Sequence, residues 1–293
     1  MRAAIVRTFE KTPTSPGRMV AENSGLRFEA QSQWRILILI AFFTGGFGAG
    51  LYVASWALDF RLGMLLGLFL VAVVKGGAHI AYLGRPERFW RAVKRPQTSW
   101  ISRGIIAMAV FVISGALYVV FDLPPLGWLA VAAAIVVMAY TGYLMAFSPS
   151  IPFWNSALLP VLFLIFSAES GTALTIPLYA TFAGARVQVL EVLEVTLLLL
   201  VAIIIYSYLY GAYHSSISAR EAVRLLMRGK LAALFFVSVV LLGLAAPIAL
   251  DVLPRMGAAS LTAMWLAAFL CIQGALSFRW VVLRAGVYVP PGY

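Results

Sequence analysis

Residues 36–58 read ILILIAFFTGGFGAGLYVASWAL, an uninterrupted run without a charged side chain. A helix of about 20 residues, rising about 1.5 Å per residue, crosses the roughly 30 Å hydrocarbon core of a bilayer. Arg35 and Asp59 bracket the run, so its uncharged length matches a membrane-spanning segment. The run therefore predicts a transmembrane helix.

Seven further apolar runs follow along the chain, separated by proline and glycine. Together the runs predict eight spans, at residues 34–58, 64–83, 100–121, 126–148, 155–181, 186–213, 231–250 and 259–284. Continuous apolar runs replace the alternating pattern of barrel strands. The predicted fold class is therefore all-α: a polytopic membrane protein built as a bundle of eight transmembrane helices.

The composition agrees with a chain embedded in lipid. Hydrophobic residues make up 62% and charged residues 11% of the 293 residues, whereas a soluble domain carries about 25% charged residues. The single cysteine, Cys271, permits neither an intrachain disulfide nor a thiolate-bound metal cluster. We expect an irregular N-terminal tail at 1–33, which has no signal-peptide core, a transmembrane domain at 34–286 and a C-terminal tail at 287–293.

The net charge of +11 is concentrated in the short connections and at the ends of the chain. Eight spans place both termini on one side, and that side collects 18 Lys and Arg residues, with Arg279 and Arg284 among them, against three on the other. By the positive-inside rule we expect a multi-pass protein of the inner (cytoplasmic) membrane with both termini in the cytoplasm. Basic residues in short loops favour contact with membrane lipid or an acidic partner protein over nucleic acid.

The connection between the second and third spans has the most distinctive sequence. Residues 82–103 read YLGRPERFWRAVKRPQTSWISR, in which Gly84 and Pro86 end one helix and Ser99 is placed to cap the next. The density of arginine, with aromatic residues between, is unusual for a simple connector. The stretch therefore indicates an ordered loop that faces phosphates or carboxylates.

The pattern LGRPERFW…RPxTSWxSRG in this stretch resembles the NrfD family of quinone-reactive membrane subunits. Three further features strengthen the resemblance: the glycine-rich first span, the SAESG stretch at 167–171, and the pair Trp154 and Asn155. The similarity covers about residues 34–284. It implies an eight-helix subunit that binds a quinone, menaquinone or ubiquinone, and holds no haem.

The resemblance also implies two partners, a ferredoxin-like iron–sulfur subunit and a molybdopterin catalytic subunit, which carry the iron–sulfur clusters and the molybdopterin. The predicted function is that of a membrane anchor in a respiratory oxidoreductase complex, exchanging electrons between the quinone pool and the iron–sulfur partner. No catalytic or metal-ligating residue is predicted in this chain. The alternative is a secondary transporter with an intramembrane site between Lys75 and Glu169, which no inverted repeat in the sequence supports.

Lys75 and His79 are candidate quinone-binding and proton-delivering residues in the second span. They lie four residues apart and so share one helix face, which Tyr82 continues. An ionisable group inside a bilayer costs roughly 2.5–3.5 kcal/mol and therefore calls for a reason. Histidine can bond a quinone carbonyl and also transfer a proton. The structural alternative is that Lys75 extends towards the interface while His79 bonds a backbone carbonyl.

Tyr140 joins these candidates through the resemblance. Characterised relatives place a tyrosine in the fourth span before the Trp–Asn pair, and Tyr140 matches that position. The alternative is a packing or interfacial tyrosine. The chain departs from the family pattern at two places: the first span begins with Trp34 and Arg35 rather than near an Asn or His, and Tyr82 stands where relatives carry His or Asp.

Three carboxylates are candidates for a proton path across the membrane. Glu169 lies near the middle of the fifth span, whereas Glu191 and Glu194 enter the sixth. With Lys75 they would form a chain of intramembrane ionisable groups. The simpler alternative is an ion pair between Glu169 and Lys75 that joins two spans, with the other two carboxylates near the outer interface.

The basic loop is a candidate docking surface for the iron–sulfur partner. Its predicted members are Arg85, Arg88, Trp90, Arg91, Arg95 and Trp100. Membrane orientation and contact with anionic lipid explain such a face as well. The glycines at 46–50 are assigned to close helix packing, because no strand precedes them as a dinucleotide-binding loop requires.

Overall fold

The computed structural model describes residues 29–186, 188–252 and 260–289. Within these ranges the regular secondary structure is helical. They also contain one isolated antiparallel β-bridge, which joins Ala30 to Val287. Most of the predicted N-terminal tail and the last residues of the C-terminal tail lie outside the described residues. The domain boundaries predicted there stay predictions.

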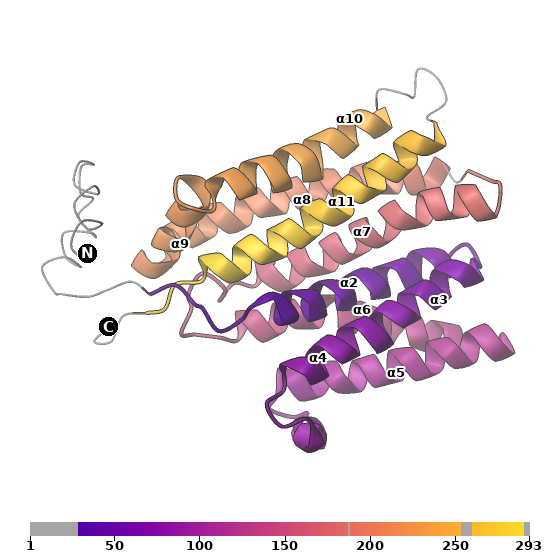
Figure 1. Cartoon of the computed structure of the whole chain (residues 1–293), viewed down its shortest axis with the longest axis horizontal. Coiled ribbons are helices and arrows are strands. Elements are labelled where there is room, and N and C mark those ends of the chain that lie inside the picture. The colour runs from indigo at the N-terminus through magenta and orange to yellow at the C-terminus, as the bar shows by residue number, and fades with distance from the viewer. Residues whose placement is uncertain (1–28, 187, 253–259, 290–293) are drawn as a thin grey trace, which may run out of the picture.

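The first half of the chain forms four spans, drawn from indigo to magenta in Figure 1. Their helices are α2 (Ile36–Trp56); α3 (Arg61–Phe69), continued by the π-helix η1 (Leu70–Lys75) and α4 (Gly76–Tyr82); α5 (Trp100–Phe121); and α6 (Pro124–Ala146). The 3-10 helix η2 (Pro86–Val93) lies in the connection between α4 and α5. This connection is therefore ordered, as the loop sequence predicts.

The second half completes the bundle and adds one short helix outside the spans. Its helices are α7 (Leu158–Phe182), α8 (Gln188–Ser215), the short α9 (Ile217–Met227), the π-helix η3 (Leu234–Ala245) continued by α10 (Ala246–Val252), and α11 (Leu261–Ala285). Ser216 and Ser260 cap α9 and α11 by accepting from backbone N–H groups.

Among the described residues, seven helices are long and apolar enough to cross a membrane, and the helix at Leu234–Leu250 is shorter but also apolar. These elements correspond one to one with the eight predicted spans, so the all-α polytopic fold class is confirmed. The spans differ in burial: 78% of the apolar window of α2 is buried, but only 28% of that of α5. Helix α2 is thus central, whereas most of the surface of α5 faces the outside of the bundle.

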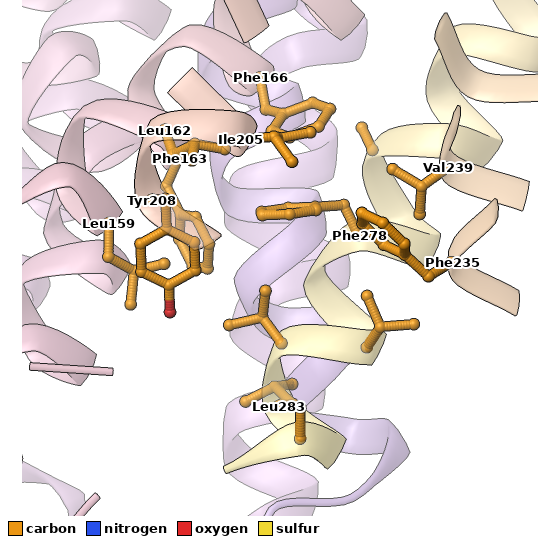
Figure 2. Close-up of a cluster of buried hydrophobic side chains, with 14 of the residues drawn as sticks. Leu159, Leu162, Phe163, Phe166, Ile205, Tyr208, Phe235, Val239, Phe278 and Leu283 are labelled. Atoms are coloured by element: carbon orange, nitrogen blue, oxygen red, sulfur yellow. The ribbon is translucent and has the colours of Figure 1, made fainter. Parts of the chain in front are cut away.

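The helices pack as two groups that share α2. Figure 1 shows α2 to α6 together below and α7 to α11 together above. Helix α2 contacts α6 in one group and α7 in the other. The larger apolar core lies in the upper group, where Phe166 and Phe278 stack with ring centres 4.8 Å apart (Figure 2). The polar groups that concern function lie on either side of α2.

The basic connections gather at one end of the bundle. The start of α2, the end of α4, the short helix α9 and the end of α11 all lie at the left in Figure 1. The bundle therefore has one strongly basic end, which is where the motif-bearing loop and the candidate site are found.

Candidate functional site

Lys75 is the last residue of η1 and is only 1% exposed. Its Nζ donates hydrogen bonds to the phenolic oxygen of Tyr140 at 2.9 Å and to the carbonyl oxygen of Ala41 at 3.3 Å. The amine also lies 4.5 Å from the centre of the Tyr140 ring. The lysine therefore turns inward, between α2 and α6, and does not extend to the membrane interface.

His79 lies one turn beyond Lys75, on α4, and is half-buried. Its Nδ1 is 3.1 Å from the Lys75 carbonyl oxygen. A carbonyl oxygen can only accept a hydrogen bond, so Nδ1 carries the hydrogen and Nε2 of the neutral ring is left as an acceptor. The histidine thus bonds a backbone carbonyl and still offers a basic nitrogen. Tyr82, at the end of α4, is exposed, and among the described residues no hydrogen bond joins it to Lys75 or Tyr140.

Tyr140 lies on α6 and is buried. Because its oxygen accepts the hydrogen bond from Lys75, its own hydroxyl hydrogen is available for another acceptor. An ammonium donor makes such a bond shorter and stronger than a neutral one. The pair is therefore suited to presenting a polarised hydroxyl to a carbonyl group.

The start of α5 fixes the loop that carries the family pattern. Ser99 caps the helix, as predicted, by accepting from the Ser102 backbone N–H at 3.3 Å. The Ser102 hydroxyl donates to the Ala92 carbonyl at 2.5 Å, which holds the end of η2 against α5. These serines therefore act on the loop backbone.

Arg103 binds the backbone of the second part of the loop. Its Nε and Nη2 donate to the carbonyls of Pro96 and Gln97, both at 2.7 Å. The guanidinium also lies 4.6 Å from the centre of the Trp100 ring. Trp100 in turn stacks on Tyr143 of α6, with ring centres 4.5 Å apart and planes 4° apart. The loop is thus anchored to α6, the helix that carries Tyr140.

A cavity opens beside this aromatic stack. It has a volume of about 470 Å³ and lies where α6 ends and α7 begins. Its lining is mostly apolar and comprises Tyr143, Ala146, Phe147, Pro149, Asn155, Ser156, Ala157 and Pro160. Because Tyr143 is one turn from Tyr140 on α6, the cavity lies close to the level of the Lys75–Tyr140 pair.

The remaining predicted docking residues are exposed on and around η2, a helix with no buried residue. Trp90 is 47% exposed, and the cations of Lys94 and Arg91 lie 4.1 and 5.6 Å from its ring centre. We call this surface the docking face; it comprises Arg85, Arg88, Trp90, Arg91 and Arg95. Because no side chain of η2 is buried, its side chains are accessible to contacts from outside the chain.

The carboxylates gather elsewhere, in the second group of helices. Glu169 of α7 and Glu194 of α8 are both buried, and Cys271 of α11 interacts with both. The Cys271 thiol donates to Glu194 Oε1 at 3.5 Å. Glu191 is half-buried one turn before Glu194. Within the described chain no ion pair joins Glu169 to Lys75, so the helix-joining pair and a transporter site between these two residues find no support.

Arg279 is the polar residue that sequence reasoning misplaced. The charge distribution in the sequence assigns it to the basic end of the bundle, but it is buried in α11 and only 1% exposed. Its Nη2 donates to Ser167 Oγ at 2.9 Å, and its guanidinium lies within 6.0 Å of the ring centres of Phe43, Phe163 and Phe166. The available signal was its place in the last apolar run, where it is the only charge between residues 261 and 283.

Membrane-spanning helices that enclose a hydrogen-bonded amine and phenol, beneath an ordered basic loop, define a class: a multi-pass membrane protein with a polar site inside the bundle. Its family follows from comparison with known proteins. Residues 27–291 match the family described as "Polysulphide reductase, NrfD", and the chain belongs to this family.

Two relatives illustrate the likeness. The protein is 27% identical to the C subunit of polysulfide reductase from Wolinella succinogenes over 298 residues, covering 86% of this chain and 94% of the relative. It is 29% identical to the C subunit of sulfite dehydrogenase from Allochromatium vinosum over 145 residues, covering 43% of this chain and 44% of that protein. Both relatives are named as subunits of oxidoreductases.

Proposed function

We propose that this chain is the membrane anchor subunit of an oxidoreductase complex and exchanges electrons between the quinone pool and a ferredoxin-like iron–sulfur subunit. The observation that carries the proposal is the buried hydrogen bond from Lys75 to Tyr140, with His79 one turn away at the basic end of the bundle. A buried amine inside a membrane is costly unless it is paired or functional. The names of the two relatives support the same assignment.

The three side chains supply what quinone chemistry requires. Reduction of a quinone to a quinol takes two electrons, from the iron–sulfur partner, and two protons. Tyr140 donates its hydroxyl hydrogen to one carbonyl oxygen, and Lys75 returns a proton to the phenol across their 2.9 Å bond. Nε2 of His79 takes up a proton from the basic end of the bundle and donates it to the second carbonyl oxygen. In quinol oxidation the same groups accept these protons.

The docking face is proposed to receive the iron–sulfur subunit. Its arginines attract an acidic partner surface, and the loop beneath it is anchored to α6, so a cluster held there lies near the quinone. The molybdopterin catalytic subunit binds the iron–sulfur subunit. On this proposal the chain lies in the inner membrane with both termini and the docking face in the cytoplasm, following the basic residues.

The buried carboxylates support a second proposal, a proton path through the upper group of helices. Glu169 and Glu194 share the Cys271 thiol, and Glu191 extends the series by one turn. Glu169→Gln should therefore abolish proton movement coupled to turnover in liposomes, followed with an entrapped pH dye, while quinol oxidation continues. Equal proton movement in the variant and the wild type would exclude Glu169 from the path.

The anchor proposal is tested on the native assembly. The tagged chain is purified from its own membrane in mild detergent, and co-purifying proteins and lipids are identified by mass spectrometry. A short-chain naphthoquinol is then added, and reduction of the iron–sulfur clusters is followed by electron paramagnetic resonance. Recovery of an iron–sulfur protein whose clusters the quinol reduces supports the proposal; a chain that purifies alone and free of quinone contradicts it.

A further inference from the structure

Two glycines lie directly against the Lys75–Tyr140 pair. A Cβ atom built on Gly45 of α2 would be 2.5 Å from Lys75 Nζ and 2.7 Å from its Cδ, closer than real Cβ atoms approach other heavy atoms. A Cβ atom on Gly104 of α5 would overlap the Tyr140 ring. The absent side chains thus leave the space that the amine and the phenol ring occupy.

Helix α2 provides more than space for the amine. The Ala41 carbonyl, which accepts from Lys75 Nζ, lies one turn before Gly45. In a helix this carbonyl already accepts from the backbone N–H four residues on, and its second lone pair is free to accept from the amine. The amine therefore packs against α2 at Gly45 and donates to the Ala41 carbonyl one turn earlier.

We propose that Gly45 and Gly104 are positioning residues, which set the Lys75 amine and the Tyr140 phenol at hydrogen-bonding distance for the quinone chemistry. The inference rests on the function proposed above. It gives a role in that site to two glycines that the sequence places in family-like motifs: Gly45 in the glycine-rich first span and Gly104 at the end of the loop pattern.

Other glycines of the bundle have different neighbours. A Cβ atom on Gly48 would meet the backbone oxygen of Gly67 at 2.8 Å, and one on Gly243 would meet Gly274 Cα at 2.5 Å. These glycines let two helix backbones approach, which is the usual role of small residues between transmembrane helices. Gly45 and Gly104 differ because their nearest neighbours are the side chains of the proposed site.

Gly45→Ala is the decisive variant. The added methyl displaces only the end of a flexible side chain, so α2 and η1 need not separate. We expect the complex to assemble, with a loss of thermal stability no larger than that of Lys75→Ala, because the methyl displaces only the amine and its hydrogen bonds. Naphthoquinol-driven reduction of the partner's clusters should slow about tenfold or more, because a hydrogen bond to a charged group is lost.

Gly77→Ala is the matched control. Gly77 lies two residues beyond Lys75 in the same span, and a Cβ atom there would meet nothing within 4 Å. Both variants make the same chemical change in a transmembrane helix. We expect the rate of cluster reduction in Gly77→Ala to equal that of the wild type.

A double variant separates positioning from packing. In a Lys75→Ala background the added methyl at position 45 has nothing to displace, so Gly45→Ala should change neither the residual rate nor the unfolding temperature further. A packing role would instead add its loss to that of Lys75→Ala. Gly104→Ala in a Tyr140→Ala background gives the same comparison for the phenol ring, because the displaced ring is absent.

The outcomes for the two proposals are distinct. A slow Gly45→Ala, a normal Gly77→Ala and no added effect in the double variant support the positioning role. A normal rate in Gly45→Ala, or an additive loss in the double variant, overturns it while Lys75→Ala remains slow. A normal rate in Lys75→Ala overturns the proposed quinone site itself, and the positioning role with it.

Discussion

Lys75 and Arg279, the two buried basic side chains of the described chain, lie against adjacent residues of α2. The Lys75 amine faces Gly45, whereas the Arg279 guanidinium and the Ser167 hydroxyl face Gly46. Successive residues on a helix point in directions about 100° apart. The glycine pair therefore separates two polar sites, one in each group of helices, and both depend on α2 having no side chain there.

The role of Arg279 in stability can be separated into packing and charge. Arg279→Ala should lower the free energy of unfolding by about 2–5 kcal/mol, since it removes a buried side chain from among Phe43, Phe163 and Phe166. Arg279→Met fills most of that volume without a charge and should cost less than about 1.5 kcal/mol. Thermal unfolding in detergent measures both. Equal losses in the two variants would show that the guanidinium itself, not its volume, stabilises the core.

Tyr140→Phe tests the hydroxyl of the proposed site. It removes the acceptor for Lys75 and the donor to the quinone but keeps the ring that packs on Gly104. We expect cluster reduction by naphthoquinol to fall about 10²-fold, the usual lower range for loss of a proton-transferring group. Tyr143→Phe is the control, since that residue stacks on Trp100 through its ring. If both variants retain the full rate, Tyr140 is a packing residue.

Arg103→Lys tests the anchoring of the loop. A lysine cannot reproduce the forked geometry that joins Arg103 to the carbonyls of Pro96 and Gln97. Losing one such charged hydrogen bond, worth about 1.5–3 kcal/mol, should raise the population of the open loop about tenfold or more. Chymotrypsin cleavage beside Phe89 and Trp90 reports that opening.

The control for the loop variant is Arg95→Lys, which changes an exposed arginine in the same segment. Its cleavage rate should match that of the wild type. Equal rates in Arg103→Lys and the wild type would mean that the loop is held by Ser102 and the aromatic stack, and not by the guanidinium.

Charge reversal tests the docking face. The triple variant Arg88→Glu, Arg91→Glu and Arg95→Glu should lose the iron–sulfur subunit during purification at about 0.15 M salt, because it repels an acidic partner surface. Arg61→Glu is the control, since Arg61 begins α3, which starts at the other end of the bundle (Figure 1), and pairs with Asp122. Retention of the subunit by the triple variant would place the interface elsewhere.

Much of this architecture is readable from local sequence. The uncharged run at 36–58 became α2, and Ser99 caps α5 as its position predicts. The loop pattern was informative because glycine, proline and serine act on the backbone within a few residues of where they stand. Span seven was also located correctly, although its π-helical turns, like those that end at Lys75, leave no mark in composition.

The partners of the buried charges were not readable in this way. Sequence spacing allowed an ion pair between Lys75 and Glu169, but the structure pairs Lys75 with Tyr140 and places Glu169 beside Cys271. The sequence also predicts the wrong place for Arg279, because a charge near the end of an apolar run can lie either at the membrane interface or inside the bundle.

The sequence by itself determined the membrane class, the eight spans and the family, because hydrophobicity, helix breakers and motifs act over a few residues. Only the tertiary structure decided that Lys75 donates to Tyr140 beside Gly45, and that Arg279 donates to Ser167 beside Gly46. The physical reason is that these helices are apolar on nearly every side, so no polar face records their rotation. Rotation and crossing are set by packing between helices far apart in the chain, and they alone choose which buried polar groups touch.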